Sequence, residues 1–186
     1  YATCQKYDLR LFIDGARLGY GLVSAACDYD LPFLAKHCDV FYIGGTKVGA
    51  MMGEAVVFSG MKAPKYFFTN VKRHGALLAK GRMLGIQFDT LFTDELYFKI
   101  SRHAIAMATR IRSIFEKHGI AIAYDSPTNQ QFVVLSPALY EALSQKVAFE
   151  IWERKSEHEI ICRFVTSWAT KEEELDELDR ILQAYA

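Results

Sequence analysis

The sequence lacks an excess of charge of either sign, and it lacks any hydrophobic run long enough to cross a bilayer. Lys and Arg together number 22, as do Asp and Glu, so no charged surface points to nucleic acid or to an anionic membrane. A membrane span needs about 20 consecutive apolar residues, and neither such a run nor a signal-peptide pattern occurs. We therefore expect a cytoplasmic protein whose partner is a small molecule or another copy of itself.

Cysteine is also scarce, and its spacing excludes the common metal motifs. The four cysteines form no C-x-x-C pair and have no nearby His at metal-ligand spacing: Cys4, Cys27, Cys38 and Cys162. We expect free thiols in a reducing compartment and no metal site. Hydrophobic residues make up 51% of the 186 positions and charged residues 24%, which is typical of one globular domain or two small ones. Tyr1 is not a methionine, and we expect the sequence to begin inside a domain.

The first half of the chain contains three short apolar runs that predict buried strands at Leu9–Ile13, Asp39–Ile43 and Ala55–Phe58. Leu31–Lys36, which includes a proline in its first turn, predicts a short helix. Short apolar strands separated by helical or loop crossovers favour an α/β sheet with both faces covered.

The middle of the chain is predicted to be largely helical. Residues Lys65–Arg82 are basic and amphipathic, which favours a helix, and the two glycines in the following GRMLGIQFDT segment favour a loop. Asp94–His118 is the longest predicted helix, with Thr93 as its cap and Gly119 as its stop.

The last part of the chain reads as a small α+β unit. Helices are predicted at Pro137–Gln145 and Lys171–Ala184. Four short strands are predicted at Ile120–Tyr124, Gln131–Leu135, Val147–Trp152 and Ile160–Thr166. We therefore divide the chain into residues 1–92, as part of a larger sheet domain, and residues 93–186, as a small C-terminal domain.

Polar residues follow two of the predicted strands. Asp14 ends the first strand and Arg17 comes three residues later, whereas Lys47 follows the second strand, after Gly44–Gly45. Ligands bind at the carboxyl ends of strands in open α/β sheets, so we expect both segments to face one crevice. A pyridoxal-phosphate (PLP) enzyme needs an amine for the cofactor, a carboxylate for the pyridine nitrogen and an arginine for the substrate carboxylate.

These three residues also have plainer interpretations. Asp14 could cap a helix or a turn, Lys47 could be a solvated loop residue, and Arg17 could pair with a neighbouring acid. A further arginine, Arg163, interrupts the apolar strand EIICRFVTSW. A charged residue on such a strand is either paired, faces a site, or lies on an edge strand with its head in water.

The segments LFIDGARLG and DVFYIGGTKVGAMMGEAVVF resemble the L-threonine aldolase and β-eliminating lyase family of fold type I PLP enzymes. The resemblance implies a mostly parallel large-domain sheet followed by a small α+β domain. It implies that Lys47 forms the Schiff base, beside Thr46, and that Asp14 partners the pyridinium. Arg17 and Arg163 would bind the substrate carboxylate.

By the same resemblance, the chain covers about half of the family's length and lacks the N-terminal half of the site. The family's basic segment corresponds to the region of Lys80 and Arg82, to which we assign no definite role. The implied reaction is cleavage of threonine or allo-threonine to glycine and an aldehyde, in a homodimer or homotetramer. The alternatives are a β-eliminating lyase, an aminotransferase, or a catalytically incomplete fragment. A nucleotide-binding domain is disfavoured because no G-x-G-x-x-G follows a strand.

Overall fold

The computed structural model describes residues 1–185, which form two compact units. The first unit comprises Tyr1–Leu22 and Cys27–Lys99, and the second comprises Val23–Ala26 and the chain from Ile100 onward. Helix α6 (Leu96–Lys117) contributes residues to both units. Our division of the chain into a cofactor-domain part, residues 1–92, and a small C-terminal domain, residues 93–186, stays a prediction.

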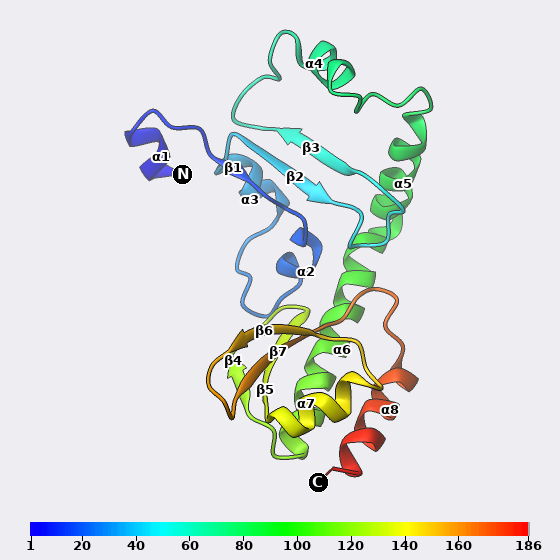
Figure 1. Cartoon of the computed structure of the whole chain (residues 1–186). Helices are drawn as coiled ribbons and strands as arrows, with labels where there is room; N and C mark the ends of the chain where they lie inside the picture. The colour runs from blue at the N-terminus through cyan, green and yellow to red at the C-terminus, as the bar shows by residue number, and fades with distance from the viewer. Residues whose placement is uncertain (186) are drawn as a thin grey trace. The chain divides into compact units, whose positions relative to one another are not determined.

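A three-stranded mixed sheet organises the first unit (Figure 1), with strands β1 (Phe12–Ile13), β2 (Val40–Gly44) and β3 (Glu54–Phe58) in that order. Strand β1 pairs parallel with β2, and β3 pairs antiparallel with β2. The loop 45–53 joins β2 directly to β3, and such a short connection can join only antiparallel neighbours. The predicted strands at 39–43 and 55–58 are therefore confirmed to within one residue, but the second connection is not a parallel crossover.

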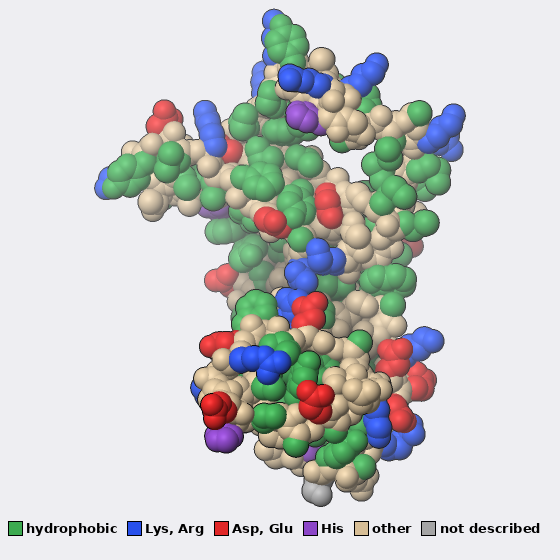
Figure 2. Space-filling model, in the orientation of Figure 1, with side chains coloured by type: hydrophobic (Ala, Val, Ile, Leu, Met, Phe, Trp, Pro, Cys, Tyr) green, Lys and Arg blue, Asp and Glu red, His purple; other side chains and the backbone are tan. Residues whose placement is uncertain are grey.

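The two faces of this sheet differ in burial. Phe41 and Ile43 point to one face and are buried, whereas the other face carries Phe12, Tyr42 and Val56. Phe12 is 58% exposed and Val56 49% exposed, and Figure 2 shows hydrophobic side chains open to solvent over this sheet. The prediction of a buried strand at 9–13 and of two covered faces is therefore wrong for this chain. The reason is that β1 pairs through two residues at the sheet edge, with its apolar side chains outside the core.

Five helices accompany the sheet in the first unit: α1 (Ala2–Lys6), α2 (Leu18–Leu22), α3 (Leu31–Lys36), α4 (Phe67–Arg73) and α5 (Arg82–Phe92). Helix α3 matches its prediction, and the Asp30 carboxylate caps it by accepting the N–H of Phe33 at 2.8 Å.

The predictions for residues 65–92 are largely wrong. The single helix expected at 65–82 ends at Arg73, because Gly75 follows in the left-handed region at φ 72°. The expected loop over GRMLGIQFDT is instead most of α5. Leu84, Phe88 and Leu91 recur there at helical spacing and turn their side chains inward, which outweighs the poor helix propensity of Gly85.

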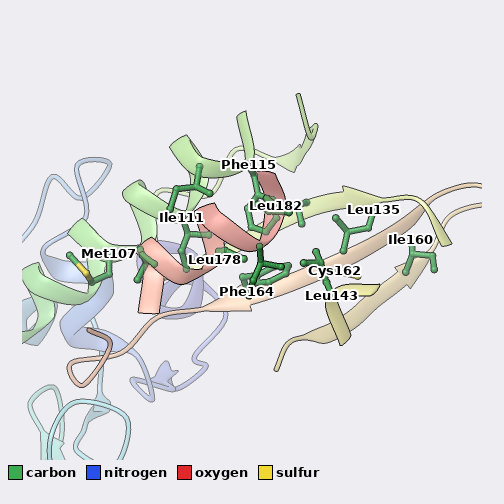
Figure 3. Close-up of a cluster of buried hydrophobic side chains, with 14 residues drawn as sticks. Met107, Ile111, Phe115, Leu135, Leu143, Ile160, Cys162, Phe164, Leu178 and Leu182 are labelled. Atoms are coloured by element: carbon green, nitrogen blue, oxygen red, sulfur yellow. The ribbon is translucent and has the colours of Figure 1, made fainter. Parts of the chain in front are cut away.

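The second unit is an antiparallel sheet packed against helices. Its strands have the order β4-β5-β7-β6, and its remaining elements are β4 (Ile122–Tyr124), β5 (Gln130–Leu135), α7 (Pro137–Ser144), β6 (Glu150–Arg154), β7 (Ile160–Val165) and α8 (Glu172–Gln183). Side chains of α6, α7 and α8 meet one sheet face in a single core, where Phe115, Phe164 and Leu182 lie together (Figure 3). The predicted small α+β unit is confirmed, and no boundary of its predicted strands and helices is shifted by more than three residues.

The ends of α6 were predicted with mixed success. Gly119 at φ 71° ends the helix as expected. Thr93 does not cap its start, because the Thr93 hydroxyl donates to the carbonyl of Asp89 at the end of α5. A short 3-10 turn (Thr93–Glu95) with positive φ at Asp94 and Glu95 separates the two helices.

His118 follows the last residue of α6 and packs against α8. Its side chain is 8% exposed, and Nε2 lies 2.7 Å from the Asp179 carboxylate on α8. The contacts of Lys117 and His118 lower the pKa of Asp179. The burial results from the packing of α8 on α6, which no local pattern reveals.

Two further observations concern residues 1–185. None of their helices combines the length and the apolar character that a membrane crossing requires. All four cysteines are free, and Cys38 and Cys162 are buried.

Candidate active site

Asp14 lies immediately after β1, in the turn that leads to α2. Its Oδ1 atom accepts hydrogen bonds from the N–H of Ala16 at 3.0 Å and from the hydroxyl of Tyr42. These bonds, chiefly the one from Tyr42, lower the pKa of Asp14, and the charges of Lys47 and Arg17 lower it further. No described residue donates to Oδ2. Asp14 thus stabilises the turn through Oδ1, as one of its alternative interpretations stated. Its carboxylate is ionised, and Oδ2 remains free.

Two glycines bring the turn after β1 into direct contact with the end of β2. The N–H of Gly44 donates to the carbonyl of Gly15 at 3.0 Å. A Cβ atom on Gly15 would lie 1.7 Å from the carbonyl oxygen of Tyr42, and one on Gly44 would lie 2.5 Å from the carbonyl oxygen of Ala16. Any side chain at either position would separate the segments that carry Asp14 and Lys47.

The backbone around Lys47 is held firmly although its side chain is exposed. Val48 is fully buried, and the N–H groups of Val48 and Ala50 both donate to the carbonyl of Gly45, at 2.8 and 3.0 Å. The Tyr20 hydroxyl donates to the carbonyl of Lys47. Among residues 1–185, none forms a hydrogen bond or ion pair with the Lys47 ammonium. The loop therefore presents an unpaired amine from a fixed backbone, next to exposed Thr46.

A buried layer that sequence reasoning missed supports these turns. The hydroxyl of Tyr97 donates to the carbonyl of Gly44 at 2.9 Å and accepts from the N–H of Gly19 at 3.1 Å, and burial raises the pKa of Tyr97. Glu54 accepts the N–H of Gly45 at 2.7 Å. Tyr97 lies 53 positions beyond Gly44 in the sequence. The sequence around Tyr97 shows only an aromatic residue near the start of a helix, so its contact with Gly44 could not be predicted.

Arg17 follows Asp14 in the same turn and is half-buried. Its Nε atom is buried and has no hydrogen-bond partner. In the part of the chain that the structure describes, no acid forms an ion pair with it, so the structure gives no support to the alternative interpretation of Arg17 as the partner of a neighbouring acid. A half-buried guanidinium with an orphaned nitrogen is suited to bind an anion.

Arg163 lies on β7 in the second unit, where β7 runs between β5 and β6. The interpretation as an edge-strand arginine with its head in water is therefore wrong, and its side chain is 19% exposed. One terminal nitrogen donates to Oε1 of Gln130 at 3.0 Å, and the other contacts the Glu150 carboxylate. Arg163 also lies over the ring of Trp152, 5.3 Å from its centroid.

The structure thus brings Asp14, Arg17, Thr46 and Lys47 together in the first unit and places Arg163 in the second. Lys80 and Arg82 are exposed at the start of α5. Within residues 1–185, no group of His, Cys, Asp or Glu side chains could hold a metal ion.

The sequence and the structure of the chain are both similar to those of known proteins. No protein-family model matches the chain. The chain is 28% identical over 184 residues to a low-specificity L-threonine aldolase of Pseudomonas sp. (strain NCIMB 10558), covering 98% of this chain and 52% of the relative. A threonine aldolase of Leishmania major superposes with a TM-score of 0.94 at 36% identity, covering 99% of this chain and 54% of that structure. The chain is therefore similar to the C-terminal half of threonine aldolases both in sequence and in structure.

More distant structures share the fold. SPT solved with PLP superposes with a TM-score of 0.64 at 12% identity, and it covers 98% of this chain. The predicted fold type I architecture is confirmed. The chain spans about half the length of the curated relatives it matches, namely their C-terminal half.

Proposed function

We propose that this chain is the C-terminal half of a PLP-dependent lyase that cleaves a β-hydroxy-α-amino acid, such as threonine or allo-threonine, to glycine and an aldehyde. The observation that carries the proposal is the contact between two turns that present an ionised carboxylate with a free oxygen and an unpaired lysine. The similarity of the chain to threonine aldolases supports the same reaction.

The residues present fit PLP. Bound PLP supplies an aldehyde that captures an amine and a protonated pyridine ring that takes up an electron pair. The unpaired Lys47 amine would hold the aldehyde carbon. Asp14 would keep a proton on the ring nitrogen through its free Oδ2, and its lowered pKa keeps it anionic for that purpose. Thr46, exposed beside Lys47, is assigned to the cofactor side of the site.

The arginines are assigned to the substrate carboxylate. Arg17 has an orphaned nitrogen beside the Asp14 turn, and a planar guanidinium can hold a carboxylate by two parallel hydrogen bonds. Arg163 is assigned to the same carboxylate. Holding it fixes the orientation of the bond between Cα and Cβ, which selects the bond that breaks. The base that removes the hydroxyl proton is assigned to the N-terminal half.

The reaction is tested by joining this chain to the N-terminal half that its relatives possess and supplying threonine and PLP. We expect glycine and acetaldehyde in equal amounts. A 2-oxo acid with ammonia would instead identify a β-eliminating lyase, and a 2-oxo acid with amino-group transfer would identify an aminotransferase. No turnover, with PLP absent from Lys47, would leave the catalytically incomplete fragment as the correct interpretation.

Tyr42 has a role that we infer from its bond to Asp14. We expect Tyr42→Phe to raise the pKa of Asp14, because its largest stabilising hydrogen bond is lost. Carbon-detected NMR titration of the Asp14 carboxyl in the 186-residue chain measures this shift directly. Tyr124→Phe is the matched control, since the Tyr124 hydroxyl donates to Glu153 in the second unit. An Asp14 titration that is the same in Tyr42→Phe and in the native chain would contradict the assignment.

We also propose a cytoplasmic homodimer or homotetramer that contains the N-terminal half. The open face of the first unit's sheet supports this, because Phe12 and Val56 are about half exposed there. Contiguous exposed apolar surface of this kind is typical of a face that another polypeptide covers.

A further inference from the structure

The surroundings of Arg163 include a carboxylate of the chain itself. Glu150 on β6 lies directly opposite Arg163 in the strand register, and its carboxylate contacts one terminal nitrogen of the guanidinium. The other terminal nitrogen donates to neutral Gln130, and the Nε atom has no partner. Arg163 is proposed to bind the carboxylate of a substrate. Without substrate, it contacts the carboxylate of Glu150 instead.

We propose that Glu150 is an internal competitor that occupies Arg163 until the carboxylate of an amino-acid substrate displaces it. Glu150 thereby lowers the affinity for substrate and helps to determine which carboxylates bind. This inference rests on the proposed function, because it takes Arg163 as a ligand of the substrate carboxylate.

The contact is suited to displacement. The Glu150 side chain is 67% exposed, so water solvates its carboxylate well when it leaves Arg163, and an ion pair of this kind adds little stability. A single terminal nitrogen makes the contact, so an incoming carboxylate that bonds two nitrogens would form the stronger arrangement. A negative charge at Glu150 also repels a second carboxylate near Arg163.

Arg163 keeps its position without Glu150. Gln130 holds one terminal nitrogen at 3.0 Å, and the ring of Trp152 lies under the guanidinium. Phe132 contacts Trp152 edge to face, with ring centroids 5.1 Å apart. Neutralising Glu150 should therefore release the guanidinium without disordering it.

The test compares Glu150→Gln with Glu153→Gln in the chain joined to the N-terminal half of its relatives. We expect Glu150→Gln to lower KM for threonine by up to about 5-fold, the factor that corresponds to 1 kcal/mol, with kcat unchanged. Glu153 lies on the same strand but accepts a hydrogen bond from Tyr124, so Glu153→Gln should leave KM unchanged. An unchanged or higher KM in Glu150→Gln overturns the inference.

A second readout needs no turnover. In the 186-residue chain, acetate should shift the guanidinium NMR signals of Arg163 at a several-fold lower concentration in Glu150→Gln than in the native chain. Equal acetate dependence in the two proteins overturns the competition. Arg163→Lys separates this failure from that of the proposed function: if KM for threonine does not rise in that variant, the role of Arg163 itself is wrong.

Discussion

Replacing Lys47 with Ala in the chain joined to its N-terminal half should lower kcat on the order of 10⁴-fold or more. Loss of a covalently acting residue removes the reaction path itself, and such residues typically account for losses of this size. The measurement is glycine formation from threonine under saturating substrate and PLP. Borohydride reduction followed by peptide mass spectrometry should place a phosphopyridoxyl group on Lys47 in the unaltered protein and on no lysine in Lys47→Ala.

The control is Lys72→Ala, which removes an exposed lysine of α4 in the same unit. It should keep full activity and the adduct on Lys47. Near-normal turnover in Lys47→Ala, or an adduct on another lysine of the unaltered protein, would contradict the central assignment. Because the backbone of residues 45–50 is held by Val48 and Gly45, the loss of an exposed side chain should not unfold the loop.

Replacing Asp14 with Asn should lower kcat by about 10²–10³-fold, the loss typical of one preorganised electrostatic contact. Asn keeps an oxygen that can accept the N–H of Ala16, so the turn persists while the negative charge is lost. The pKa of Asp14 is lowered, so its charge is present above that pKa and is lost only as pH falls through it. The ratio of kcat in the native protein to kcat in Asp14→Asn should therefore stay constant from neutral pH down into the acid range.

This prediction is checked by steady-state kinetics as a function of pH, with Asp30→Asn as the control. Asp30 caps α3 through its side chain, and Asn caps helices equally well, so that variant should behave as the native protein does. If kcat in Asp14→Asn stays within about twofold of the native value, Asp14 is a turn residue and no more.

Local patterns predicted most of the elements. The apolar runs that became β2 and β3 are short and bounded by glycine or polar residues, and the small α+β unit has four strands of alternating or continuous apolar character. These elements bury side chains with a period that the backbone geometry imposes, so the period is visible in the sequence.

Elements whose boundaries depend on distant contacts were predicted badly. Helix α5 contains Gly85, and its stability derives from burying Leu84 and Leu91 in the first unit rather than from propensity. The exposure of Phe12 could not be predicted either, because an apolar strand in an incomplete sheet has the same sequence as one in a covered sheet.

The candidate site divides in the same way. Asp14, Arg17 and Lys47 could be selected from the sequence because their chemistry and their places after strands are local properties. Tyr42, Tyr97 and Glu150 could not be selected, because each acts through a partner on another element.

The sequence by itself therefore determined the resemblance to threonine aldolases, the kinds of element and the residues with reactive groups. Tertiary structure decided which of those groups are free and which are held. Pairing two strands placed Tyr42 against Asp14 and Glu150 against Arg163. Such contacts depend on strand register, because a shift of one residue would turn each of these side chains to the opposite face of its sheet.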